Sequence, residues 1–143
     1  MISFLNALRT LFKILFAAIF IFGGMNHFRD SALYAGMIPP WLPAHLQLVY
    51  ISGVAEILLG LLFLIPRFTR PAAWGLVALL IAVFPANLHM ALHTNLYSGF
   101  NPIALWIRLP LQGVLIAWAW AYAMKPSQKK HNREQHDRTK IPA

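Results

Sequence analysis

One acidic residue in a long apolar run is the feature of this sequence with the most chemical potential. Glu56 lies near the middle of Leu46–Ile65, a run long enough to cross a bilayer as one helix. A carboxylate at that depth costs about 3 kcal/mol, so it should face a protein interior or a wet cavity and is a functional candidate. Gly53 and Gly60 share its helical face and allow another backbone to approach closely. The alternative is a protonated Glu56 that hydrogen-bonds a neighbouring helix and only fixes the packing.

Other polar residues fall at similar depths in neighbouring apolar segments. With a helical rise of about 1.5 Å per residue, Arg108 lies about 7 Å below the outer edge, Asn87 about 8 Å, Gln112 about 13 Å and Glu56 about 15 Å. His27 lies where the first segment emerges. We therefore predict an internal polar cluster with His27 at its mouth. Two alternatives stay open: Arg108 can extend outward to phosphates, and the two amides can act only as interhelical hydrogen bonds.

Two histidines have the i, i+4 spacing of a metal-binding pair. His27 and His45 are expected on the same side of the membrane as His89 and His93. No acid accompanies the pair in an HExxH arrangement, and the chain has no cysteine. We predict no metal site and interpret these residues as histidines near the headgroup region.

The composition defines the class of protein. The chain has 143 residues, of which 59% are hydrophobic and only 11% charged, so it is too apolar for a soluble domain. Its length allows one bundle of spanning helices and no separate catalytic domain. The absence of cysteine excludes thiolate chemistry within the chain. The net charge is +8, and the basic residues flank the hydrophobic segments. This distribution indicates membrane orientation and not nucleic-acid binding.

We predict an all-α bundle of four transmembrane helices, which would position these polar residues. The predicted spans are Met1–Gly24, Leu46–Ile65, about Ala72–Leu92 and about Ile103–Met124. Between the first two spans we expect a connection at Gly23–Pro43 with a short interfacial helix at Phe28–Met37, and between the last two an uncharged loop at Thr94–Pro102. Residues 1–124 thus form one transmembrane domain, and Lys125–Ala143 is expected to be a disordered basic tail. A cleaved signal peptide is the alternative interpretation of the first span.

Loop charges predict the orientation. Basic residues gather near the start of the first span, between the second and third spans, and in the tail, whereas the other two connections are close to neutral. This distribution places both termini in the cytoplasm.

Several segments, in this order, resemble the DoxX family of small bacterial four-helix membrane proteins. They are GGMNHF (23–28), MIPPWLP (37–43), YISGVAEILLGLLFLIPRFTRPAAWGL (50–76), VFPANLHMAL (83–92) and RLPLQ (108–112). The resemblance covers nearly the whole chain before the tail and implies a multi-pass protein of the bacterial inner membrane. It also maps the family's recurrent polar positions onto His27, Glu56, Asn87 and Arg108. The cysteine of some redox-active relatives is absent.

The resemblance and the polar cluster lead to one functional hypothesis. We expect an accessory component of a membrane redox system, without catalytic activity of its own, that binds a small ligand such as a quinone in an outer-half cavity. Arg108, Asn87 and Gln112 would hold the ligand's carbonyl groups, Glu56 would exchange protons, and His27 would stand at the entrance. Its partners would be the lipid bilayer and other membrane or soluble redox subunits.

Two alternatives belong to other classes of protein. A small transporter or permeability element would use the same cluster as a substrate or proton site, with a homodimer supplying a second half. A scaffold would instead dock a soluble partner or the anionic leaflet on the basic tail.

Overall fold

The computed structural model describes residues 2–124, and the predicted tail at Lys125–Ala143 lies outside the described residues. The described chain is all-α, as predicted. Its elements are α1 (Ile2–Arg29), α2 (Ser31–Met37), α3 (His45–Leu64), α4 (Thr69–Leu92), the 3-10 helix η1 (Thr94–Tyr97) and α5 (Pro102–Ala123). Four of them, α1, α3, α4 and α5, are long and apolar enough to cross a membrane.

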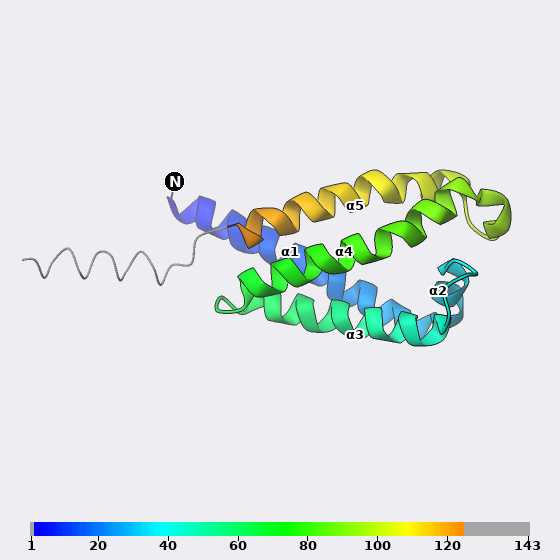
Figure 1. The fold of residues 1–143 in the computed structure, drawn as a ribbon. Coiled ribbons are helices and arrows are strands. Elements are labelled where there is room, and N and C mark those ends of the chain that lie inside the picture. The colour runs from blue at the N-terminus through cyan, green and yellow to red at the C-terminus, as the bar shows by residue number, and fades with distance from the viewer. Residues whose placement is uncertain (1, 125–143) are drawn as a thin grey trace, which may run out of the picture.

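The four long helices associate as two pairs. In Figure 1, α1 (blue) lies along α3 (teal), and α4 (green) lies along α5 (yellow to orange). The α3–α4 turn closes one end of the bundle, and the short α2 lies at the other end, where it contacts α3, α1 and α4. Chain neighbours α4 and α5 thus pack together, whereas α1 pairs with the second long helix across the α2 connection.

Element boundaries differ from the predictions at three places. The first helix does not end at Gly24 but continues to Arg29, so the GGMNHF segment is helical and not part of the connection. The third span begins at Thr69, because Pro71 falls in the first turn, where a backbone N–H has no helical partner to lose. The expected loop at Thr94–Pro102 contains η1.

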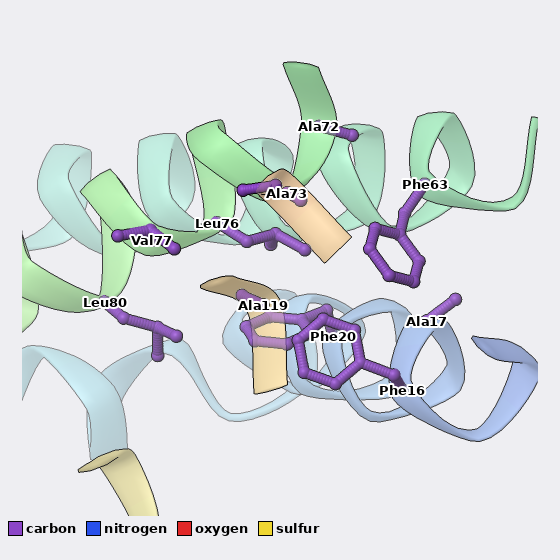
Figure 2. Packing of buried hydrophobic residues seen from close by; sticks show 11 residues of the cluster. Phe16, Ala17, Phe20, Phe63, Ala72, Ala73, Leu76, Val77, Leu80 and Ala119 are labelled. Carbon is purple, nitrogen blue, oxygen red and sulfur yellow. The ribbon is translucent and has the colours of Figure 1, made fainter. Parts of the chain in front are cut away.

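A hydrophobic core fills the half of the bundle next to the α3–α4 turn. Phe16 of α1 and Phe63 of α3 are fully buried, with ring centroids 5.0 Å apart, and Leu76 of α4 is fully buried beside them. Figure 2 shows the same region, with Ala119 of α5 completing the contact among all four long helices. The polar residues singled out in the sequence lie toward the other half, beyond this core.

Basic side chains close the same end of the bundle. The Nζ atom of Lys13 donates a hydrogen bond to the carbonyl oxygen of Leu64 at 3.1 Å, and Nε of Arg70 donates to that of Ala123 at 3.0 Å. Both carbonyls lie at helix C-termini, where the acceptors lack intrahelical donors and the helix dipole favours a cation.

Candidate functional site

The closest contact between ionisable groups of opposite type in the described part of the chain joins α1 to α3. Nε2 of His27 lies 3.6 Å from Oε1 of Glu56, and the two side chains are 13% and 17% exposed. His27 occupies the last turns of α1, and Glu56 lies past the middle of α3. Two of the five predicted site residues are therefore neighbours.

Three glycines allow this approach. A Cβ atom on Gly24 would lie 2.6 Å from the carbonyl oxygen of Gly53, and one on Gly53 would lie 2.8 Å from Cβ of His27. A Cβ on Gly23 would lie 2.9 Å from Oε2 of Glu56. The close packing of α1 on α3 depends on glycine at these positions, since any larger residue would force the helices or the carboxyl group apart. Gly53 was predicted from sequence to allow close packing, but its partners on α1 were not.

The other ring nitrogen of His27 is held by α3. Nδ1 lies 3.0 Å from the carbonyl oxygen of Val49 and 2.9 Å from Oγ of Ser52, and the Ser52 hydroxyl donates to the same carbonyl at 3.0 Å. Tyr34 of α2 covers the imidazole, with ring centroids 4.1 Å apart. Sequence reasoning missed Ser52 and Tyr34. Ser52 carried a usable signal, because it precedes Glu56 by four residues and so shares its helical face.

A second polar pair joins α4 to α5. Nδ2 of Asn87 donates to Oε1 of Gln112 at 3.1 Å, and Nε2 of Gln112 donates to the carbonyl oxygen of Leu80. Gln112 is buried, with 4% of its surface exposed. The Leu80 carbonyl lies one turn before Pro85, the proline inside α4. These amides largely satisfy each other, an arrangement typical of interhelical hydrogen bonding.

Arg108 is directed toward α2. Its NH1 group donates to Sδ of Met37 at 3.4 Å, and among the described residues no carboxylate lies within 4.0 Å of it. A thioether is a weak acceptor, and a guanidinium carries five N–H donors, so most of its donor capacity is not used by the described side chains. Arg108 is therefore not within ion-pair distance of Glu56. Its side chain does contact the protein, at Met37.

The charges of Glu56 and Arg108 both affect the pKa of Tyr34. Burial raises the pKa of the Tyr34 phenol, the nearby Glu56 and Asp30 raise it further, and Arg108 opposes them. α2 itself contacts α3, and its last residue, Met37, accepts a hydrogen bond from Arg108 of α5. The five predicted residues thus form two pairs, His27–Glu56 and Asn87–Gln112, with Arg108 beside α2.

The remaining histidines form a separate aromatic group. Nδ1 of His89 lies 3.0 Å from the Tyr97 hydroxyl, the rings of His89 and His93 stack with centroids 4.3 Å apart, and Trp41 packs edge-on against His89. Burial raises the pKa of the Tyr97 phenol in η1. Within residues 2–124 no three His, Cys, Asp or Glu side chains are grouped so as to hold a metal ion.

These features define a multi-pass membrane protein with one polar pair between α1 and α3 and another between α4 and α5. The chain belongs to the family described as a domain of unknown function, DUF8561, whose family model matches residues 16–123. No curated protein and no solved structure matches the chain significantly. The family description names no activity, so the resemblance to DoxX proteins, the redox association and the choice of membrane remain predictions.

Proposed function

We propose that this protein is an accessory component of a redox system in the bacterial inner membrane and binds a quinone-like head group beside α2. The observation that carries the proposal is the pair formed by His27 and Glu56, 3.6 Å apart and only partly enclosed. An acid and an imidazole at this spacing, within apolar helices, are suited to taking up or releasing the proton that accompanies quinone reduction or oxidation.

Arg108 is the proposed anchor for a ligand carbonyl. Its only hydrogen-bond partner among the described residues is the thioether of Met37, which a carbonyl or phenolate oxygen would replace as a stronger acceptor. Tyr34 packs on the imidazole of His27 and is proposed to face the same ligand. Asn87 and Gln112 are proposed to have a different role from the one expected from sequence. They hold α4 against α5, since both ends of the Gln112 amide are paired and the Asn87 amide donates to it.

The basic end of the bundle is proposed to face the cytoplasm. Arg9, Lys13, Arg67 and Arg70 lie at the end of the bundle that the α3–α4 turn closes. The positive-inside rule then places both termini inside and the region around His27 and Arg108 in the outer half of the membrane.

The test is a binding measurement with decylubiquinone on the full chain in detergent, combined with mass spectrometry of co-purified small molecules. Arg108→Ala and Glu56→Gln are compared with wild type, and Arg67→Ala is the matched control because that arginine is exposed at the opposite end. Circular dichroism first establishes that each variant retains wild-type helicity.

We expect wild type and Arg67→Ala to bind the quinone and Arg108→Ala to lose at least tenfold in affinity. Glu56→Gln should bind the oxidised quinone but lose the pH dependence of binding. Lipid alone, co-purifying equally with all four proteins, together with no decylubiquinone binding, would overturn the proposal. Equal binding by wild type and Arg108→Ala would remove Arg108 from the site.

A further inference from the structure

The proton positions on His27 follow from the chemistry of its neighbours. A backbone carbonyl has no proton to donate, so the 3.0 Å contact between Nδ1 and the Val49 oxygen is a hydrogen bond only if Nδ1 carries the proton. The Ser52 hydroxyl is directed at that same oxygen, which leaves the lone pairs of Oγ facing Nδ1 at 2.9 Å. Nδ1–H therefore has two acceptors on α3, one from the main chain and one from Ser52.

The opposite tautomer would be unfavourable at this position. With Nδ1 unprotonated, its lone pair would face the Val49 carbonyl at hydrogen-bonding distance with no hydrogen between them. Ser52 could then donate to Nδ1, because the Val49 carbonyl also accepts the helical N–H of Gly53, but the two facing acceptors would remain in contact. A contact between two acceptors with no hydrogen between them is repulsive, so the Nδ1–H form is favoured.

We propose that Ser52 and the Val49 carbonyl hold His27 as the Nδ1–H tautomer and make its Nε2 atom the proton acceptor for Glu56. A bare Nε2 and an ionised carboxylate would present lone pairs to each other at 3.6 Å, so the pair holds one proton between them. In one form the proton is on the Glu56 carboxyl group, and in the other it is on Nε2. Ser52 is then a positioning residue for a proton relay between α3 and α1.

The transfer within the pair is balanced. The O–H bond of Glu56 breaks, an N–H bond forms at Nε2 of His27, and a neutral pair becomes an imidazolium next to a carboxylate with the same net charge. A 3.6 Å separation is slightly longer than a hydrogen bond, and a small side-chain rotation would close it. The proton's outside donor or acceptor is the ligand of the proposed function, and in that clause alone the inference rests on it.

The groups around the pair come from each neighbouring element. From α2, Tyr34 packs on the imidazole, and Asp30 lies at the start of the same helix. From α5, Arg108 reaches the α2 segment, and on α4 the uncharged Asn87 is bonded to Gln112. On α1 itself, Arg29 is exposed. The charged side chains on these elements are thus Arg29, Asp30 and Arg108.

Two other histidines provide internal references by the same reasoning. Nε2 of His45 lies 3.1 Å from the carbonyl oxygen of Pro39, which requires a proton on Nε2. Nδ1 of His93 lies 3.1 Å from the carbonyl oxygen of His89, which requires a proton on Nδ1. His27 and His93 should therefore share one tautomer, and His45 should have the other.

The experiment is solid-state NMR of the full chain in liposomes, with ¹⁵N-labelled histidine rings and no added quinone. His27→Gln and His45→Gln assign the two signals by subtraction. We expect His27 to show a protonated Nδ1 and His45 a protonated Nε2. Ser52→Ala should raise the Nε2–H population of His27 at least twofold and leave His45 unchanged, whereas Ser52→Thr, which keeps the hydroxyl, should retain the wild-type spectrum.

Glu56→Gln tests the shared proton. Its amide cannot give up a proton at accessible pH, so the Nε2 signal of His27 should stay at its unprotonated position through the pH range in which wild type changes. Infrared spectra should also lose a protonated-carboxyl C=O band in this variant. A His27 with bare Nδ1 and protonated Nε2 in wild type would overturn the inference. Failure of decylubiquinone to bind would overturn only the proposed function, since the tautomer is measured without it.

Discussion

Gly24 of α1 and Gly53 of α3 are in backbone contact, so close that a Cβ on Gly24 would lie 2.6 Å from the Gly53 carbonyl oxygen. His27 follows Gly24 by one helical turn, and Glu56 follows Gly53 by one turn. The glycine contact therefore sets the separation at which the imidazole and the carboxyl group meet. The packing of Gly24 against Gly53 thus determines the geometry of the His27–Glu56 pair.

Gly24→Ala should destabilise the protein, because the new methyl group would meet the Gly53 carbonyl oxygen and the inner side-chain atoms of Glu56 and Ile57. None of these is the flexible end of a side chain. We expect a loss of about 1–3 kcal/mol in the free energy of unfolding, the usual cost of overpacking. Unfolding in mixed micelles with increasing SDS fraction, followed by circular dichroism, measures it.

Gly113→Ala is the matched control, since a Cβ there meets no atom within 4 Å and α5 should gain from a better helix former. Its stability should equal or exceed that of wild type. Equal losses in the two variants would mean that the glycine contact between α1 and α3 is not what limits stability.

Gln112→Leu should weaken the α4–α5 pair. The substitution removes the acceptor of the Asn87 amide and the donor of the Leu80 carbonyl, both within the bundle. Interhelical hydrogen bonds of this kind contribute about 1 kcal/mol each at most sites in membranes, so we expect a loss of about 1–2 kcal/mol in the same unfolding assay. Gln47→Leu, at an exposed position near the start of α3, should change the stability little; a comparable loss there would point to a general effect of losing glutamine.

Glu56→Gln should fold and be about as stable as wild type. The amide keeps the shape of the carboxyl group and can donate to Nε2 of His27, while the cost of an ionisable group among apolar helices disappears. We expect the free energy of unfolding to change by less than about 1 kcal/mol. Glu56→Leu, which leaves Nε2 without a partner, should be the less stable of the two. The reverse order would show that the acid contributes through its charge.

Labelling of introduced cysteines should confirm the orientation, and the chain offers a clean background because it has no native cysteine. Ser98→Cys follows η1, and Pro66→Cys lies in the α3–α4 turn, at opposite ends of the bundle. In intact cells with a permeabilised outer membrane, a membrane-impermeant maleimide should label Ser98→Cys, and it should label Pro66→Cys only after lysis. The opposite pattern would invert the proposed topology.

The sequence by itself was sufficient to predict the all-α fold and four spanning helices, because long apolar runs have few alternatives in a membrane. It also singled out Glu56, since an acid within such a run needs a specific environment. It did not predict that α1 continues to Arg29, because the cost of Gly23 and Gly24 in a helix is offset only by packing against α3.

Tertiary structure decided how the polar residues associate. The depth of a residue along its helix gives one coordinate. It does not give the rotation of each helix or show which helices pack together. The sequence therefore predicted a single cluster of Glu56, Asn87, Arg108, Gln112 and His27. The pairing of α1 with α3 and of α4 with α5 separated it into two pairs. The packing of α2 at one end of the bundle brought in Tyr34 and Met37, whose contacts with His27 and Arg108 no local pattern encodes.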